Sequence, residues 1–385
     1  MKILHIIYTN GISGAEKHLK YLLPGLVSKG IECELLILCP PFCFTLLSNF
    51  SDEMNRVGVK STVISIRNNV SIKTLTVVKN FLINKKFSIV HSHLLRTDLI
   101  VSLIKQFYLK NLYIISTKHG YQENVLISYN PSHPKIKKDI IYYITKYTFG
   151  KINKNISISK AISELFINLK LTKHYFPVIY HGVDISIGLL ENTRLNKGNS
   201  IKLLIVGRLE KYKGHIYAIK AFKIISEKYS NAKLVFLGEG SEKDALKKDA
   251  AKLGLTDKIL FLGFQNNPFD YIINSNIIII PSIFEPFGLV FIEAMALKTP
   301  IVAFDTPAGN ELLVNNKTAM LSPKFDVDSL AHNIIELLED RIKSKLISDN
   351  ALISYQNNFT TEIMIKNIIT FYQKIELEQI KLANL

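Results

Sequence analysis

Short apolar runs alternate with longer amphipathic stretches along most of the chain. The runs are rich in Ile, Val and Leu, as in Ile277–Ile280, whereas the stretches repeat apolar residues at helical spacing, as in His215–Tyr229. Strands that are buried on both faces and joined by helices produce this alternation. The pattern therefore predicts an α/β protein built from βαβ units.

The expected strands form two series. The first series is Lys2–Tyr8, Glu32–Leu38, Thr62–Ile66, Ile89–His93, Leu112–Thr117, Asn155–Ser159 and Pro177–Tyr180. The second series is Ile201–Val206, Lys233–Leu237, Ile259–Leu262, Ile277–Pro281 and Ile301–Phe304. Helices are expected between the strands, for example Ala15–Lys29, Ser71–Asn84 and Glu242–Leu253. The polar segment Glu191–Ser200 separates the two series and is typical of a linker.

Two doubly wound, Rossmann-like domains account for this order, and we place them at residues 1–190 and 200–360. A length of 385 residues exceeds what one ordinary core organises. The part from Asp326 to Leu385 lacks strand character and predicts two or three helices. The last of them, residues 361–385, repeats apolar residues at spacings near three and four, so one of its faces must be buried.

The segment Pro281–Leu289 carries the strongest candidate site. It follows an expected strand, and Gly288 begins an expected helix, whose first backbone N–H groups and dipole favour an anion such as a diphosphate. Glu285 and Glu293 lie eight residues apart across this turn. One carboxylate would accept hydrogen bonds from sugar hydroxyls and the other from a ribose. A surface loop followed by an ordinary helical glutamate is the alternative.

Two basic residues, Arg208 and Lys213, follow the strand that ends at Gly207. They are expected at the carboxyl edge of the sheet, where ligands of doubly wound folds bind. Two cations there would neutralise a diphosphate leaving group. Arginine is scarce in this chain, which makes Arg208 the stronger candidate, and a solvated loop is the alternative for Lys213.

A glycine-containing turn, Gly11 to Gly14, lies between the first expected strand and helix. Its glycines would allow the backbone to approach a phosphate closely. Neither this turn nor Gly238–Gly240 matches the G-x-G-x-x-G fingerprint of dinucleotide-binding proteins. The sequence therefore does not favour a dehydrogenase.

Together these motifs resemble family 4 of the retaining glycosyltransferases, which have the GT-B architecture. The resemblance covers nearly the whole chain and is strongest from Gly207 to Glu311, where Glu285 and Glu293 match the family's E-x7-E motif. It implies two Rossmann-like domains that face a cleft, with the last helix crossing back to the first domain. It also implies transfer of a sugar, with retention, from a nucleotide diphosphate donor to an acceptor.

The resemblance assigns a role to each motif in the second domain. Glu285 would contact the transferred sugar, Glu293 would hold the ribose, and Arg208 and Lys213 would clamp the diphosphate. The backbone groups implied to meet the sugar and phosphates are those of Phe287, Gly288 and Leu289. The base would be held by backbone in the loops at Gly238 and at Gly263, Phe264 and Gln265.

In the first domain, the resemblance implies that the turn from Gly11 to Gly14 closes on the phosphates. His119, in the step Lys118-His119-Gly120, would reach the transferred sugar. A buried structural histidine is the alternative for His119, and it is the expectation for His91, His93 and His133. His181 stands where asparagine is commoner, and Pro307–Glu311 is a variant of the usual Gly-Gly turn, which leaves the identity of the donor open.

No cofactor is expected beyond the donor substrate itself. No acidic D-x-D motif follows a strand, so Arg208, Lys213 and the helix dipole would take the place of Mg²⁺. The sequence names no carboxylate nucleophile for a double displacement. Retention would then follow from front-face attack within an ion pair, as the resemblance implies.

The net charge of +16 comes almost entirely from lysine. Proteins that recognise nucleic acids usually use arginine for bidentate contacts, and arginine is scarce in this chain. No nucleic-acid-binding motif is present either, so no nucleic-acid partner is expected. A proteome biased towards Lys, Ile and Asn explains the charge, and attraction to an anionic membrane or to phosphorylated substrates is the other explanation. The stretch His133–Lys138 before the aromatic segment Ile140–Tyr147 suits a membrane interface, unless that segment packs as a structural helix.

We expect a cytoplasmic protein, in contact at most with the inner face of the membrane. No apolar stretch reaches the roughly 18 residues that a membrane span needs, and no export signal is visible. Three clustered cysteines, Cys33, Cys39 and Cys43, are expected to be reduced thiols. The expected partners are a nucleotide-sugar donor and a glycan or lipid-linked acceptor in bacterial cell-surface polysaccharide or lipopolysaccharide assembly.

Two other functions compete with sugar transfer. A sugar-nucleotide epimerase on the same scaffold would bind a similar donor but would need acid and base residues and no acceptor. A non-catalytic binding protein would keep the fold, but loss of Glu285, Arg208 or the turn at Gly288 would then be expected, and all three are present.

Overall fold

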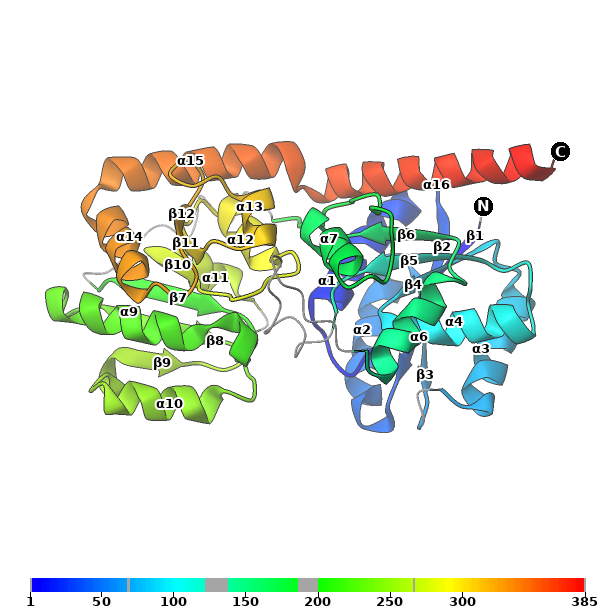
Figure 1. Ribbon diagram of the computed structural model, residues 1–385, viewed down its shortest axis with the longest axis horizontal. Coiled ribbons are helices and arrows are strands. Elements are labelled where there is room, and N and C mark those ends of the chain that lie inside the picture. Colours follow the sequence, from blue (N-terminus) through cyan, green and yellow to red (C-terminus); the bar gives the residue numbers. More distant parts are fainter. Residues whose placement is uncertain (1, 68–69, 122–137, 186–199, 266, 384–385) are drawn as a thin grey trace. The chain divides into compact units, whose positions relative to one another are not determined.

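The computed structural model describes residues 2–67, 70–121, 138–185, 200–265 and 267–383, which form two compact units (Figure 1). Within these ranges the first unit runs to Gly182 and includes the last helix from Thr361 onward. The second unit runs from Val183 to Thr360. Of the predicted linker Glu191–Ser200, all but Ser200 lies outside the described residues.

A six-stranded parallel sheet forms the centre of the first unit, in the order β3-β2-β1-β4-β5-β6. Its strands are β1 (Lys2–Tyr8), β2 (Glu32–Cys39), β3 (Lys60–Ser65), β4 (Ile89–His93), β5 (Tyr113–Lys118) and β6 (Lys154–Ser157). Its helices are α1 (Gly14–Ser28), η1 (Pro41–Cys43), α2 (Phe44–Arg56), α3 (Ile72–Lys85), α4 (Leu95–Phe107), α6 (Ile140–Phe149), α7 (Lys160–Asn168) and α16 (Thr361–Ala383).

The second unit contains another six-stranded parallel sheet, in the order β12-β11-β10-β7-β8-β9. Its strands are β7 (Lys202–Val206), β8 (Lys233–Leu237), β9 (Ile259–Phe261), β10 (Ile277–Ile280), β11 (Ile301–Phe304) and β12 (Met320–Ser322). Its helices are η3 (Lys211–Lys213), α9 (His215–Lys228), α10 (Lys243–Lys252), η4 (Thr256–Lys258), α11 (Phe269–Ile273), α12 (Leu289–Ala296), α13 (Pro307–Leu312), α14 (Val327–Glu339) and α15 (Arg341–Asn358).

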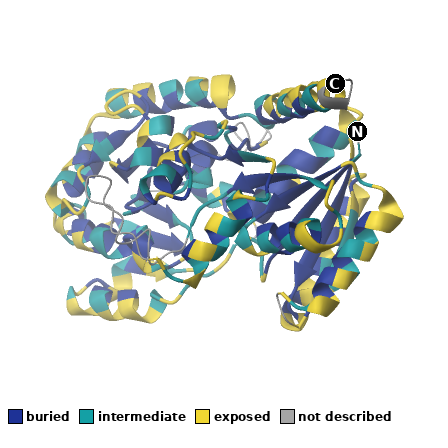
Figure 2. Ribbon diagram, turned by 45° about the vertical axis from the view of Figure 1, so that its right-hand side comes forward, coloured by how far each residue is buried: buried dark blue, intermediate teal, exposed yellow. Residues whose placement is uncertain are grey.

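The strands form where the chain is apolar at consecutive positions. All four isoleucines of β10 are buried, because helices cover both faces of a parallel sheet and leave no strand face to water. Figure 2 shows the strands of each unit in the dark blue of buried residues, with exposed positions concentrated on the surrounding helices. The predicted α/β class with two doubly wound sheets is confirmed.

Two differences from the predicted strands have local causes. Pro177–Tyr180 makes only a single bridge, between Val178 and Ser157, and Pro177 has no N–H to extend a ladder. The strand β12 was not predicted, since three residues are too short to show a period in the sequence. The other strands lie within two residues of their predicted bounds.

The last helix, α16, is part of the core of the first unit. The side chains that it buries there are Met364, Ile365, Ile368, Tyr372 and Ile375. It packs on α1, where Gly25 allows the close approach: a Cβ at Gly25 would lie 1.9 Å from Cδ1 of Ile365. This burial explains the apolar spacing that the sequence shows in the tail.

The basic segment predicted to meet a membrane is described only from Lys138 onward. The helix that follows it, α6, turns Tyr142, Thr145 and Thr148 inward and packs against α4. Its Ile140 and Tyr143 are exposed. No described helix combines the length and the apolar character that a membrane span requires.

Candidate functional site

The order of strands in the second unit defines one edge where a ligand is expected. The chain proceeds outward from β7 to β8 and β9, and then returns to place β10 on the other side of β7. Ligands of open α/β sheets bind at such a switch point, outside the carboxyl ends of the strands. A small pocket lies there, and its lining includes the last residues of β7 and of β10.

Several predicted site residues line this pocket. Lys213 and Glu285 enter it as charged side chains, and Gly288 contributes backbone at the start of α12. Two polar lining residues had been given no role from the sequence: His215, and Ser282 within the candidate segment Pro281–Leu289. The sequence signal for Ser282 was its place two residues after the strand β10, and that for His215 its place at the first position of α9.

The two charged residues of the pocket bind each other. Nζ of Lys213 lies 2.7 Å from Oε2 of Glu285, and Oγ of Ser282 donates to the same oxygen at 3.2 Å. Both charged side chains are largely buried. Burial alone lowers the pKa of Lys213, but attraction and hydrogen bonding from Glu285 outweigh it and raise the pKa above its ordinary value. The lysine therefore stays charged, and an anion entering the pocket meets it already paired.

The other predicted cation, Arg208, is held by neighbouring groups. Its Nη2 donates to Oη of Tyr212 at 2.6 Å, and Nε2 of His215 lies 2.9 Å from its carbonyl oxygen. Since a carbonyl only accepts, His215 carries its proton on Nε2. Burial lowers the pKa of His215 to about 4, so the ring is neutral at pH 7. This neutral histidine fixes the backbone of the loop that bears Arg208.

The start of α12 has the backbone geometry predicted for an anion site. Gly288 adopts φ +94°, and a Cβ there would lie 2.3 Å from the ring of Phe291, so no other residue fits without displacement. Among the residues that the structure describes, no side chain caps this helix. Gly288, Val290 and Phe291 line the pocket, so the first N–H groups of the helix and the positive end of its dipole lie beside it.

The remaining predicted residues of the second unit lie around this edge. Glu293 is buried in α12, Leu289 is the first residue of that helix, and Phe287 is buried with its ring 6.4 Å from that of Phe359. The loops predicted to hold the base are joined, because the N–H of Gly238 donates to the carbonyl of Gly263 at 2.8 Å. Phe264 is exposed beside them.

The predicted residues Gly11, Gly14 and His119 belong to the first unit. Ser13 caps α1, and Glu16 accepts hydrogen bonds from the backbone N–H of Ser13 at 2.7 Å and from its hydroxyl at 2.8 Å. A carboxylate thus already occupies part of this helix start. A phosphate bound at the turn from Gly11 to Gly14 would have to lie beside that negative charge.

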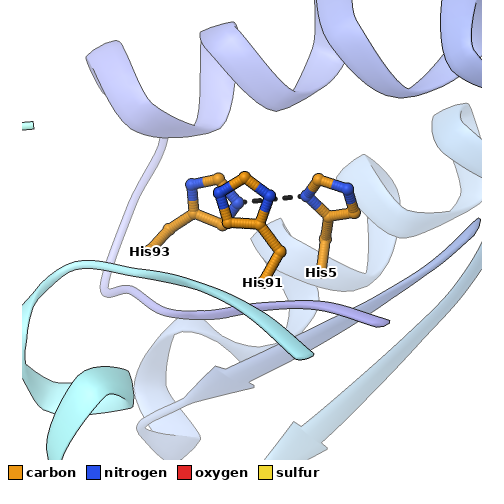
Figure 3. Close-up of side chains that lie close together, drawn as sticks. All are labelled: His5, His91 and His93. Carbon is orange, nitrogen blue, oxygen red and sulfur yellow. Dashed lines mark hydrogen bonds between the residues drawn. The ribbon is translucent and has the colours of Figure 1, made fainter. Parts of the chain in front are cut away.

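Histidines gather at the switch point of the first sheet, where β1 and β4 are neighbours. His5 lies on β1, and His91 and His93 lie on β4; Figure 3 shows their rings together, with a hydrogen bond between His5 and His93. Nitrogens of the three rings lie within 4.8 Å of one another. The histidines packed around them are His18, His119 and His181. His91 and His93 are buried, as predicted, and His133 lies outside the described residues.

Hydrogen bonds connect these rings in series. Nε2 of His93 lies 3.1 Å from Nδ1 of His5, and Nδ1 of His93 lies 3.0 Å from Nε2 of His119. His93 therefore uses both of its ring nitrogens. It links a fully buried ring to the partly exposed ring that the resemblance implicates in sugar contact.

Tyr372 of α16 extends the series beyond His5 and connects it to His91. Its hydroxyl lies 3.2 Å from Nε2 of His5 and 2.6 Å from Nδ1 of His91, whose Nε2 lies 2.7 Å from Oγ1 of Thr117. Imidazole nitrogens are common metal ligands. Here, however, each ring nitrogen of His5, His91 and His93 already has a hydrogen-bond partner, so the cluster is accounted for as a hydrogen-bond network.

Acidification is expected to unfold the first unit before the second. Burial lowers the pKa of His5 and His18 to about 3. Three more buried histidines have a pKa well below 6.5: His91, His93 and His181. The unfolded chain takes up these protons near pH 6.5, so stability falls as the pH drops from there towards 3. Each histidine removes up to about 1.4 kcal/mol per pH unit.

Hydrogen exchange measured peptide by peptide at rising temperature would check this at pH 7.5 and 5.5. Peptides of the first unit should lose protection at a temperature lower by about ten degrees or more at pH 5.5. The second unit, where His215 is the buried histidine among the described residues, serves as the internal control. An equal shift of both units would contradict the explanation.

The comparisons with known proteins agree with this architecture. The family model Glycosyltransferase Family 4 matches residues 12–187, and the model Glycosyl transferases group 1 matches residues 190–354. The solved structure of HepE from Anabaena in complex with UDP is similar over 97% of this chain and 100% of that chain, with a TM-score of 0.78 and 19% identity. The two units thus have the GT-B fold, as predicted.

Characterised and uncharacterised relatives match shorter regions. An uncharacterized glycosyltransferase of Methanocaldococcus jannaschii is 30% identical over 249 residues, which span 61% of this chain and 63% of the relative. The N-acetylgalactosamine-N,N'-diacetylbacillosaminyl-diphospho-undecaprenol 4-alpha-N-acetylgalactosaminyltransferase of Campylobacter jejuni is 31% identical over 185 residues, 46% of this chain and 48% of the relative. Between them the two family models span most of the chain, and the chain belongs to glycosyltransferase family 4.

Proposed function

We propose that this protein is a retaining, metal-independent glycosyltransferase that moves a hexosyl group from a nucleotide diphosphate sugar to a glycan or lipid-linked acceptor. The observation that carries the proposal is the pocket at the switch point of the second sheet. It brings Lys213, Glu285 and the uncapped start of α12 together where a ligand of this fold binds.

Each group at the pocket has a task in this reaction. The diphosphate leaving group gains negative charge as the glycosidic bond to the donor breaks. Arg208, Lys213 and the first N–H groups of α12 would stabilise that charge without a metal. Glu285 would accept hydrogen bonds from the transferred sugar, and Glu293 from the ribose. Front-face attack by the acceptor within the ion pair would then retain the anomeric configuration.

The relatives support the choice of donor and acceptor. HepE was solved with UDP, which favours a uridine diphosphate sugar as the first donor to test. The Campylobacter relative acts on a diphospho-undecaprenol-linked sugar, which favours a lipid-linked acceptor and a place in cell-surface polysaccharide assembly. Such an acceptor would bring the protein to the inner face of the membrane, where its excess of lysine favours an anionic surface.

Calorimetric titration of the protein with UDP, GDP and ADP, each with EDTA and with Mg²⁺, tests the site and the metal-free mechanism. At least one nucleotide should bind equally well in both buffers. Binding that disappears with EDTA would refute the metal-free mechanism.

Product analysis with the corresponding UDP-sugars and an acceptor separates transfer from epimerisation, since an epimerase would change the donor sugar without any acceptor.

Replacing Glu293 with Gln should weaken nucleotide binding about tenfold, because a charge-assisted hydrogen bond to the ribose would become a neutral one. The substitution keeps the volume of this buried side chain. Glu227→Ala, at an exposed glutamate of α9, is the control and should leave the affinity unchanged. If Glu293→Gln binds the nucleotide as the wild type does, Glu293 does not hold the ribose.

A further inference from the structure

Six side chains of the first unit are joined by hydrogen bonds in one unbroken series, which runs from Thr117 to His119. In order, its members are Thr117, His91, Tyr372, His5, His93 and His119. Burial holds the pKa of all four histidines below the ordinary value, so each ring is neutral at pH 7. A neutral imidazole has one N–H donor and one acceptor nitrogen. Each ring therefore donates in one of its bonds and accepts in the other, so the direction can reverse only at Tyr372, whose oxygen has two lone pairs. If that oxygen accepted from both rings, the buried hydroxyl hydrogen of Tyr372 would lack an acceptor among the described residues, which costs about 1–3 kcal/mol. The bonds avoid that cost when all of them point the same way along the series.

Two directions satisfy this condition, and the hydroxyl of Thr117 distinguishes them. If His91 donated to Thr117, the hydroxyl hydrogen of Thr117 would have no acceptor, because His91 is the partner that the structure gives this buried group. An unsatisfied buried donor costs about 1–3 kcal/mol. If Thr117 donates to His91 instead, every buried N–H and O–H along the series has an acceptor.

The second direction fixes the proton on each ring. Thr117 donates to Nε2 of His91, whose Nδ1–H donates to the oxygen of Tyr372. The hydroxyl of Tyr372 donates to Nε2 of His5, whose Nδ1–H donates to Nε2 of His93. Nδ1–H of His93 then donates to Nε2 of His119. His119 is left with its own proton on Nδ1.

We propose that this series holds His119 as the Nδ1–H tautomer and that Tyr372 is a positioning residue for it. Tyr372 is the one member that must accept from one ring and donate to another, which phenylalanine cannot do. It comes from α16, 281 residues away from His91 in the sequence. The last helix therefore serves the site in addition to the core of the first unit.

The tautomer determines what His119 can offer a ligand. Its Nε2 is occupied as an acceptor from His93, and the described residues give Nδ1 no partner. His119 therefore presents a single neutral N–H donor, suited to an uncharged ligand oxygen such as a sugar hydroxyl. It does not present a basic nitrogen that would remove a proton from the acceptor. This consequence rests on the proposed function, whereas the tautomer itself does not.

Nitrogen NMR of the full chain labelled with ¹⁵N at the histidine rings tests the tautomer directly. At pH 7.5 the signals of His5, His91, His93 and His119 should show a protonated Nδ1 and an unprotonated Nε2. His119→Gln identifies the signals of His119 by their loss. His215 is an internal reference of the opposite tautomer, since its Nε2–H donates to the carbonyl of Arg208. A proton on Nε2 of His119, or an imidazolium, would overturn the proposal.

Replacement of Tyr372 by Phe tests the positioning role. We expect His119 to lose its single tautomer and to show signals averaged between the two forms. The matched control is Tyr355→Phe, which removes the hydroxyl of another buried tyrosine, 2.9 Å from the carbonyl of Val183 in the second unit. The control should leave the His119 signals unchanged, and a wild-type His119 spectrum in Tyr372→Phe would refute the role of Tyr372.

Kinetics of the same two variants extend the test to transfer. Tyr372→Phe should lower kcat about tenfold or more, because His119 no longer presents its donor in a fixed orientation, while the affinity for UDP stays that of the wild type. Unchanged kcat together with an altered His119 tautomer would show that His119 does not contact the reacting sugar. The NMR result stands apart from the activity, so failure of the proposed function and failure of this inference are distinguishable.

Discussion

Replacing Glu285 with Gln should reduce sugar transfer severely and, at the same time, strengthen the binding of a nucleoside diphosphate. In the structure the Glu285 carboxylate lies 2.7 Å from Nζ of Lys213, and both side chains are largely buried. The neutral amide would release the lysine for the diphosphate and would remove a negative charge next to it. We expect the affinity for UDP to rise roughly threefold or more, a modest gain because solvent screens part of the interaction.

Transfer should fall by about 100-fold or more, since the proposed contact of Glu285 with the sugar strengthens in the transition state. Calorimetry gives the affinity, and a fixed-time assay with saturating donor gives the rate. Ser282→Ala is the matched control, because it removes only the 3.2 Å hydrogen bond to the same carboxylate oxygen and keeps the ion pair. Weaker UDP binding in Glu285→Gln would show that the carboxylate supports the diphosphate site and does not compete with it.

Truncation of the chain after Thr360 should prevent the first unit from folding and leave the second unit intact. The truncation removes α16, which contributes five buried side chains to the core of the first unit: Met364, Ile365, Ile368, Tyr372 and Ile375. Each contributes about 1.5–3 kcal/mol of burial. The sum is comparable to the entire stability of a domain, about 5–15 kcal/mol. The truncation also removes the hydroxyl that joins His5 and His91.

Hydrogen exchange by peptide would follow both units of the truncated chain. The first unit should exchange fully at 25 °C, whereas the second should keep its protection and its nucleotide affinity. The control is the double substitution Leu377→Ala and Ile380→Ala, at two exposed apolar positions of the same helix, which should leave both units protected. Protection of the first unit without α16 would show that its core is complete without that helix.

The sequence alone predicted most strands of the two sheets and named candidate residues at the carboxyl edge of the second sheet. Four consecutive isoleucines in β10 and the runs like it predict parallel strands, because side chains buried on both faces leave no polar alternation. The turn at Gly288 and the carboxylates Glu285 and Glu293 were found because they sit at fixed spacing around a strand end and a helix start. Those signals come from residues close together in the chain, so they can be recognised in the sequence without knowledge of the tertiary structure.

Only the tertiary structure decided which of these groups meet. Lys213 and Glu285 are 72 residues apart, and their ion pair depends on β7 and β10 being neighbours, an order that the strand pattern leaves open. Of the histidines in the network, the sequence predicted that His91 and His93 are buried and the resemblance implied that His119 contacts a sugar, whereas His5 was not singled out. Their connection to Tyr372 depends on α16 packing against the first sheet. The contacts of such a network join residues far apart in the chain, and no periodicity along the sequence records which distant side chains a packed core brings within hydrogen-bond distance.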